Sequence, residues 1–289
     1  MINTEKINSY FFAFLTKVKN LKFLIGYELS KRQKRTTINN LIVSLTTFDK
    51  RIDNVEITIK SLLTQTVLPS KIILHVDEID KKLVPKSLLS LESEKFEIRY
   101  CEDLGPYTKS IPLLNNLSKI NHHYDWIVIC DDDIIYPPSW LKDFQLEKFQ
   151  GEKTAVAHRC HKAFLDRNGD FLPYNAWSKI DADTYQHELF PTGVGGIALP
   201  IKSINSFFFT TRIFLELAPT SDDVWIYFLL KLSDIKVFHT NSKFKFKEWV
   251  VRKKFRLSKV NNKEGANGFS PNDIALQKCK IFFDSWKVS

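Results

Sequence analysis

Closely paired cysteines are absent from this sequence. Its four cysteines, Cys101, Cys130, Cys160 and Cys279, lie far apart, and no two of them form a CxxC pair. Zinc ribbons and disulfide-stapled domains need closely spaced cysteines, so the spacing argues against both. Isolated cysteines fit a protein that stays in a reducing cytosol.

A long uninterrupted apolar run is also missing. The nearest candidate, residues 10–25, is broken by Lys17, Lys19 and Lys22. A transmembrane helix needs roughly 20 apolar residues, and a signal peptide needs a cleaner apolar stretch preceded by positive charge. Neither is expected here. Both nucleotide-binding glycine patterns, GxxxxGK[ST] and GxGxxG after a first strand, are absent as well.

The composition indicates a folded protein with an anionic partner. The chain has 289 residues, which suits one large domain or one domain with appendages, and its 44% of hydrophobic residues is ample for a core. The 42 Lys and Arg residues against 33 Asp and Glu residues give a net charge of +9. Such an excess favours a nucleotide, a nucleic acid, a phosphorylated acceptor or an anionic membrane.

Two basic segments lie toward the ends of the chain. In residues 1–36, apolar positions recur at helical spacing and a cluster of Lys and Arg follows, which predicts an amphipathic helix. This helix could lie on an anionic membrane surface or pack on the domain, and Lys22 interrupts its apolar stripe. Residues 243–259 mix Lys and Arg with aromatic residues, which suits anionic lipid, a phosphorylated lipid-linked acceptor or a nucleic acid.

Between these segments, apolar strands alternate with amphipathic helices. This β-α-β order implies an α/β fold with a mostly parallel sheet and helices on both faces. The strands are predicted at 41–45, 71–76, 97–100, 126–130, 154–158, 197–201 and 235–239. The helices are predicted after Asp53, through 111–117, from 137 to about 149, and from Ser221.

Three consecutive aspartates, Asp131, Asp132 and Asp133, follow the buried strand predicted at 126–130. Three like charges repel each other and are costly to keep ionised together without a cation. A hard divalent ion such as Mg²⁺ or Mn²⁺ takes carboxylate oxygens and can bind phosphates on its open side. Open α/β sheets bind their ligands at the carboxyl ends of the strands. The pattern therefore indicates a metal–diphosphate site, with a solvated acidic turn as the alternative.

Other acidic sites fit the triplet less well. The alternating loop ligands, the glycine and the terminal glutamate of an EF-hand are absent. Phosphatases with an aspartate nucleophile usually carry it on an early strand, whereas several βα units precede this triplet.

A second acidic pair, Asp222 and Asp223, opens the helix predicted from Ser221. Either residue could simply cap the helix and complement its dipole. A carboxylate at this position could also act as a general base that takes a proton from an attacking hydroxyl.

Two further segments could take part in ligand or metal binding. The segment FPTGVGG, which contains Gly195 and Gly196, either permits close backbone approach to a ligand or forms a tight turn. His239 ends the last predicted strand and could complete a metal shell, although single histidines are more often structural.

Together these motifs resemble a glycosyltransferase of the GT-A fold, near the family 2 type found in bacterial lipopolysaccharide and capsule gene clusters. The resemblance covers about residues 40–240. It rests on the motifs IVSLTTFDKR, SLLTQT followed by LPSKIILHV, GPYTK, WIVICDDDIIYPPSWL, TGVGG and SDDVW, in this order. The Gln-xx-Arg-Trp signature of processive synthases is missing, which favours transfer of one or a few sugars.

The resemblance implies which residues bind the donor. Thr46, Thr47 and Arg51, at the end of the first strand, would grip the nucleobase. Lys109 of the GPYTK motif would reach the diphosphate, and Asp132 would contact the donor sugar or its ribose.

The resemblance also implies a metal site, a base and an acceptor site. Asp131 and Asp133 would hold Mn²⁺ or Mg²⁺ between the protein and the donor diphosphate, with His239 as a further ligand. Asp223, with Asp222 beside it, would be the catalytic base. The residues expected beside the acceptor are Gly195, Gly196 and Trp225.

The resemblance thus implies a metal-dependent, inverting glycosyltransferase of bacterial surface polysaccharide synthesis. It would move a sugar from a nucleotide-sugar donor, foremost a UDP-sugar, to a glycan or lipid-linked acceptor. We expect a basic extension (1–36), a GT-A catalytic domain (37–240) and a basic and helical extension (241–289). Within the domain, residues 37–133 would bind the nucleotide-sugar and residues 134–240 the acceptor. The expected location is the cytoplasm, either free or attached peripherally to the cytoplasmic face of the inner membrane.

Two alternatives stay open at this point. The first is a non-catalytic sugar- or nucleotide-binding protein on the same fold, which would share the aspartates without needing a base. The second is a nucleic-acid-binding protein, suggested by the net charge of +9 and the basic stretch, although that stretch lies outside the expected catalytic core.

Overall fold

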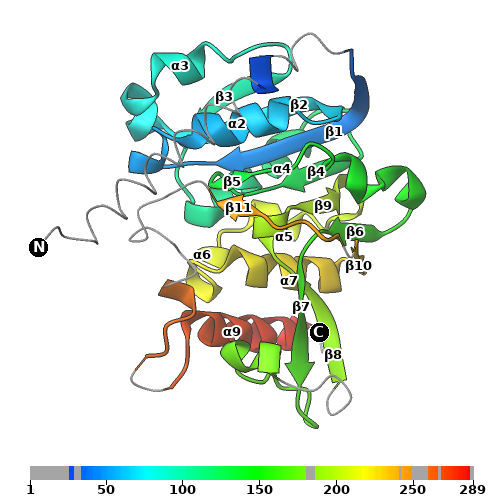
Figure 1. Cartoon of the computed structure of the whole chain (residues 1–289). Coiled ribbons are helices and arrows are strands. Elements are labelled where there is room, and N and C mark those ends of the chain that lie inside the picture. Colours follow the sequence, from blue (N-terminus) through cyan, green and yellow to red (C-terminus); the bar gives the residue numbers. More distant parts are fainter. Residues whose placement is uncertain are drawn as a thin grey trace, which may run out of the picture.

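Seven strands form one central sheet, in the order β10-β6-β9-β4-β1-β2-β3 (Figure 1). The structure is a computed structural model, and it describes residues 26–28, 34–179, 186–240, 242–248, 260–265 and 268–286. The strands of this sheet are β1 (Thr36–Thr46), β2 (Val67–Asp77), β3 (Phe96–Cys101), β4 (Trp126–Ile129), β6 (Thr154–Ala157), β9 (Ile197–Pro200) and β10 (Lys236–His239).

Most neighbouring strands of the sheet run parallel. β1 pairs in parallel with β2 and β4, β2 with β3, and β6 with β10. In this sheet β9 alone runs the other way, between β4 and β6. The predicted α/β class, with a mostly parallel sheet flanked by helices, is therefore confirmed.

Helices cover both faces of the sheet, and alternate side chains of its inner strands (β1, β2, β4, β6 and β9) enter two separate apolar cores. In β1, Ile42 belongs to one core, whereas Leu41 and Val43 belong to the other. Strands buried on both faces read as continuous apolar runs, which explains the sequence pattern. The helices are α2 (Val55–Leu63), α3 (Lys86–Leu89), α4 (Ile111–Leu117), α5 (Phe207–Thr210), α6 (Phe214–Leu217), α7 (Asp222–Leu232) and α9 (Pro271–Trp286).

The helix predicted from 137 to about 149 is wrong. The segment forms two short 3-10 turns, η4 (Lys142–Phe144) and η5 (Leu146–Phe149), on either side of Gln145. The φ of Gln145 is 51°, and one residue in the left-handed region ends a right-handed helix. The apolar side chains that suggested a helix, Trp140 and Phe144, are instead buried against the sheet.

Two small antiparallel sheets were not expected from the sequence. β7 (Cys160–Leu165) pairs with β8 (Gln186–Pro191), and this hairpin extends below the central sheet in Figure 1. β5 (Ile134–Ile135) pairs with β11 (Lys247–Glu248). In both sheets the paired strands are far apart in the sequence, so no hairpin turn in the sequence predicts the pairing.

The helix predicted from Ser221 is present as α7, which lies between the central sheet and α9 in Figure 1. Trp225 on this helix is only 1% exposed. Its indole packs against Phe208, Phe214 and Phe283, and its Nε1 donates a hydrogen bond to the carbonyl oxygen of Phe208 at 3.1 Å. Trp225 is therefore part of the core, and the expectation that it contacts an acceptor is wrong.

The predicted basic segments lie largely outside the described residues, which begin at residue 26 and omit 249–259. Among the helices that are described, none has both the length and the apolar character to cross a membrane.

Gly196→Ala should destabilise the fold more than Gly151→Ala does. Both glycines have left-handed φ values, 90° and 79°, so an alanine is strained at either position. At position 196 the new Cβ would also lie 2.6 Å from Cζ2 of the buried Trp140, whereas at 151 it would meet nothing within 4 Å. We expect the free energy of unfolding to fall by about 1–3 kcal/mol more in Gly196→Ala, measured by urea denaturation. Equal losses in the two variants would contradict this packing.

Candidate functional site

The carboxyl ends of β1 and β4 meet at one edge of the central sheet. The two strands pair in parallel, and the chain leaves β1 toward β2 on one side while β4 lies on the other. Such a switch point in an open α/β sheet leaves a crevice outside the strand ends. A pocket of about 730 Å³ opens here, lined by residues from both strand ends, from the start of α7 and from the β7–β8 hairpin.

The three aspartates after β4 are divided between two basic partners. Asp131 faces the pocket and pairs with Lys109, with its side chain 31% exposed. Asp132 and Asp133 both form ion pairs with Arg51, the latter at 2.8 Å from Oδ2 to Nη2. Burial raises the pKa of Asp132 to about 7, although the Arg51 guanidinium opposes this shift. Arg51 thus offsets the repulsion between Asp132 and Asp133, and Asp131 is held by a different cation.

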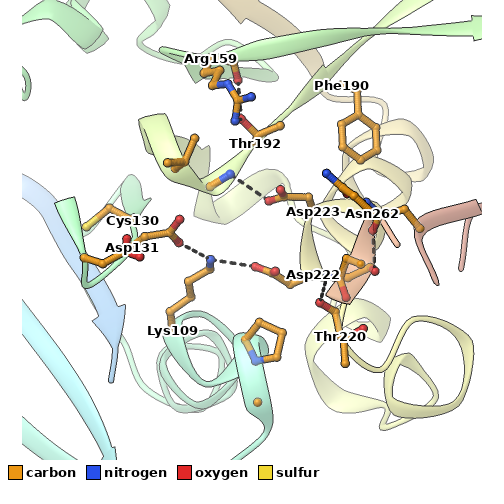
Figure 2. A pocket seen from close by; sticks show the side chains of 18 of the residues that line it. Lys109, Cys130, Asp131, Arg159, Phe190, Thr192, Thr220, Asp222, Asp223 and Asn262 are labelled. Carbon is orange, nitrogen blue, oxygen red and sulfur yellow. Dashed lines mark hydrogen bonds and ion pairs between the residues drawn. The ribbon is translucent and has the colours of Figure 1, made fainter. Parts of the chain in front are cut away.

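Lys109 joins the two acidic sites (Figure 2). Its Nζ lies 2.9 Å from Oδ1 of Asp131 and 2.9 Å from Oδ2 of Asp222. The hydroxyl of Ser44 in β1 donates to the Lys109 carbonyl at 2.6 Å and fixes the backbone from which this side chain extends. Burial lowers the pKa of Lys109, but Asp131 and Asp222 outweigh it and hold the pKa well above its usual value. Lys109 is therefore a permanent buried cation.

Asp222 and Asp223 begin α7 in different environments. Asp222 is 8% exposed and its carboxylate is held by Lys109. Asp223 is less buried, and its Oδ1 accepts a hydrogen bond from the backbone N–H of Gly193 at 2.9 Å. Burial and the charge of Asp222 raise the pKa of Asp223 to about 7. Asp223 thus offers the pocket a carboxylate that can take up a proton near neutral pH.

The acidic strand end suits a divalent cation whose shell is completed by a ligand's phosphates. Asp131 and Asp133 both line the pocket and supply hard carboxylate oxygens. Within the described part of the chain, no three His, Cys, Asp or Glu side chains gather into a complete metal cluster. Mg²⁺ usually takes one or two protein carboxylates and keeps waters and phosphate oxygens as its other ligands. The carboxylates of Asp131 and Asp133 therefore fit a cation that binds together with a diphosphate.

Most of the residues predicted to bind the donor lie together in this pocket. Thr46, Arg51, Lys109 and the three aspartates line it. Thr47 does not, because it is 1% exposed beneath the strand end. His239 ends β10, the outermost strand of the sheet, and is not among the lining residues. Since β6 and β9 lie between β10 and β4, the structure does not bring His239 to Asp131 and Asp133.

The glycines predicted to contact the acceptor, Gly195 and Gly196, lie behind the surface of the pocket. Gly195 and Gly196 are buried and do not line the pocket. A Cβ on Gly195 would lie 2.9 Å from Cβ of Arg159, so the missing side chain leaves room for that residue. Gly193 does line the pocket, and a Cβ there would lie 2.9 Å from Nζ of Lys109. The prediction that Gly195 and Gly196 contact an acceptor is therefore wrong, because of these three glycines only Gly193 lines the pocket.

Several pocket residues were not predicted from the sequence. They come from the start of β7 and the residue before it, from the turn at 174–179 and from the segment before α9, which are distant in sequence and meet only in the fold. A local signal existed in the His and Arg residues at 158–161. The newly found lining residues include Arg159, His161, Tyr174, Asn175 and Asn261. Asn272, at the start of α9, also lines the pocket, and its sequence context allowed either an acceptor contact or a role at the helix start.

Comparisons with known proteins give fold-level similarity alone. No protein-family model matches the chain, and no curated protein matches it either. It is similar to a 4-diphosphocytidyl-2C-methyl-D-erythritol synthase from Anaerococcus prevotii, at 16% identity and a TM-score of 0.42, over 73% of this chain and 90% of that one. A second synthase of this name matches at 9% identity and a TM-score of 0.43, over 73% and 94% of the two chains. The galactosyltransferase LgtC, solved with donor and acceptor sugar analogs, matches at 12% identity and a TM-score of 0.39, over 71% and 74%. Because these similarities are low, the function is inferred from the site.

Lys109→Met should destabilise the protein strongly and in a pH-dependent way. The change leaves Asp131 and the buried Asp222 without their cation, and breaking a buried ion pair costs about 3–5 kcal/mol. Without Lys109 the pKa of Asp222 rises further, because Lys109 is the group that lowers it. A protonated Asp222 needs no cation, so the loss should be smaller at pH 5 than at pH 8 in urea denaturation.

Lys202→Met provides the control for this prediction. Lys202 pairs with Asp125 but its side chain is 65% exposed, so its loss should cost less than about 1 kcal/mol at either pH. Similar losses in the two variants, or a loss in Lys109→Met that does not change with pH, would contradict the buried bridge.

Proposed function

We propose that this chain is a nucleotide-sugar-dependent glycosyltransferase of the GT-A type, related to family 2. The observation that carries this proposal is the pairing of two acidic sites across one pocket at the carboxyl edge of the sheet. One site, Asp131 and Asp133, suits a metal–diphosphate, and the other, Asp223, is a carboxylate with a pKa raised to about 7. A metal-assisted displacement needs both, whereas a binding protein needs the first alone.

The donor would lie over the ends of β1 and β4. Thr46 and Arg51 from β1 and the loop after it face the same space as Asp131 and Asp133. A divalent cation bound by these aspartates would supply positive charge to the leaving diphosphate. Lys109 adds a fixed positive charge beside Asp131 and limits the repulsion between this carboxylate and the diphosphate. We therefore assign residues 37–133 to donor binding.

The base would be Asp223 rather than Asp222. The carboxylate of Asp222 is held by Lys109, which stabilises its ionised form and makes it a poor proton acceptor. The carboxylate of Asp223 has no such ion pair among the described residues, and the Gly193 N–H orients it. A base is most effective when its pKa lies near the working pH, which is the case for Asp223.

The reaction would be a single displacement with inversion. An acceptor hydroxyl attacks the anomeric carbon of the donor sugar and passes its proton to Asp223. A new C–O bond forms as the bond from that carbon to the diphosphate oxygen breaks, and the nucleoside diphosphate leaves with the electron pair. A UDP-sugar donor, a glycan or lipid-linked acceptor and a role in bacterial surface polysaccharide synthesis complete the proposal, with residues 134–240 on the acceptor side.

Asp223→Asn should abolish turnover and leave donor binding intact. The amide cannot accept the proton, so Mn²⁺-dependent hydrolysis of UDP-sugars, with water as acceptor, should fall by about 10²–10⁴-fold. In the unchanged protein the rate should rise with pH and level off above about pH 7, because Asp223 must be deprotonated to act. The affinity for UDP, measured by calorimetry, should stay within about threefold, or about 0.6 kcal/mol.

Asp234→Asn is the matched control. Asp234 lies just beyond the other end of α7, is exposed, and has a φ of 54°, a conformation that asparagine tolerates well. This variant should keep both the rate and its pH profile. Near-normal hydrolysis by Asp223→Asn would remove Asp223 as the base and favour a non-catalytic sugar- or nucleotide-binding protein.

UDP should stabilise the protein only together with Mg²⁺ or Mn²⁺. A ligand that binds the native state alone, at 100 times its dissociation constant, adds about 2.7 kcal/mol to the free energy of unfolding. Asp131→Asn and Asp133→Asn should each lose most of this gain in a thermal-shift assay, because each removes a carboxylate from the proposed cation site. Asp125→Asn, at the opposite end of β4, should keep it. A gain that persists in both strand-end variants would place the cation elsewhere.

A further inference from the structure

The basic side chains of the pocket are not equivalent. Arg51 pairs with Asp132 and Asp133, and Lys109 pairs with Asp131 and Asp222, so the charges of both are balanced within the protein. Arg159 also lines the pocket and is exposed, yet it forms no ion pair with any carboxylate of the described residues. Its guanidinium contacts two neutral groups, the hydroxyl of Thr192 at 3.5 Å and Nε2 of His161 at 3.4 Å.

The neighbours of Arg159 leave its charge uncompensated. Burial, helped by the charge of Arg159, lowers the pKa of His161 to about 4, so this ring is neutral near pH 7 and can accept from the guanidinium. A hydroxyl and a neutral imidazole orient the guanidinium without balancing it. An arginine that is oriented but unpaired is suited to bind a carboxylate or a phosphate of a ligand through two parallel hydrogen bonds.

The backbone of Arg159 is fixed next to the proposed base. The N–H of Thr192 donates to the Arg159 carbonyl at 3.0 Å, and the next residue, Gly193, donates to Asp223. Gly195 lets the chain approach closely, since a Cβ there would lie 3.0 Å from the Arg159 nitrogen. One short turn therefore contacts both Arg159 and Asp223 (Figure 2).

Tyr174 lies within reach of both groups. Burial raises the pKa of the Tyr174 phenol, Asp223 raises it further, and Arg159 lowers it. Tyr174 itself lines the pocket beside His161, with ring centroids 5.7 Å apart. This part of the pocket adjoins the proposed cation site, because a Cβ on Gly193 would lie 3.3 Å from Oδ1 of Asp131 and 3.4 Å from Oδ1 of Asp223.

We infer that Arg159 binds an anionic group of the acceptor, so that the acceptor is an acidic or phosphorylated sugar. This inference rests on the proposed function for the identity of Asp223 as the base. The other two basic side chains named for this pocket, Arg51 and Lys109, are already paired with aspartates, so Arg159 is the one suited to hold the charge of an anionic acceptor. With that charge held, a hydroxyl of the same sugar lies toward Asp223.

The test compares three small sugars in the presence of saturating UDP and Mg²⁺, which fill the donor side. The probes are methyl β-D-glucuronide, glucose 6-phosphate and the neutral methyl β-D-glucoside, with binding measured by saturation-transfer NMR. We expect at least one charged probe to bind about tenfold more tightly than the neutral one. Glucuronide preference points to an acidic sugar, and preference for the phosphate points to a phosphorylated one.

Arg159→Gln should remove this preference, and Arg159→Lys should keep part of it. Arg167→Gln, which removes another exposed arginine outside the pocket, is the matched control and should keep all of it. UDP binding, measured in the same samples, should be unchanged in every variant and shows that each is folded. A parent protein without any preference for the charged probes, or a preference that survives in Arg159→Gln, would overturn the inference. If the unsubstituted protein shows no metal-dependent binding of UDP, that result would instead count against the proposed function.

Discussion

The buried ammonium of Lys109 is the interaction on which the rest of the site depends. It joins the end of β4, through Asp131, to the start of α7, through Asp222. Two carboxylates this close to one low-dielectric pocket would repel each other, and the cation between them converts that repulsion into two attractions. The bridge also fixes the width of the pocket at its base, because neither wall can move without exposing an unpaired buried charge.

The ion pairs of Lys109 and Arg51 give the aspartates of the pocket different roles. Asp222 is engaged on the protein side, so Asp223 is left to face the ligand with a raised pKa. Asp132 is engaged by Arg51 and supports the strand end, which leaves Asp131 the most exposed carboxylate of the triplet. Adjacent, identical side chains thus acquire distinct roles, because they differ in their exposure and in whether Lys109, Arg51 or the backbone of Gly193 holds them.

The parts of the fold that local patterns encode were predicted well. The apolar runs of the parallel sheet and the start of α7 follow from periodicity, and the strand-end aspartates stand out because no local partner explains them. Contacts between distant segments were not predictable. The burial of Trp225 depends on α9, and the position of Arg159 depends on the β7–β8 hairpin. His239 was misplaced for the same reason, because sequence order does not show that β10 lies at the edge of the sheet.

The acidic pocket carries a cost in stability that a bound donor would offset. Burial raises the pKa of Asp132 and of Asp223 to about 7, well above the value of an unfolded aspartate. A carboxylate whose pKa is raised by folding favours the native state fully only below its unfolded pKa, and that contribution is lost as the pH rises to about 7. At neutral pH the free protein therefore holds carboxylates that would be better solvated in the unfolded chain. A divalent cation with its diphosphate would stabilise the ionised cluster, so relief of this electrostatic cost would contribute to the free energy of binding of the proposed donor.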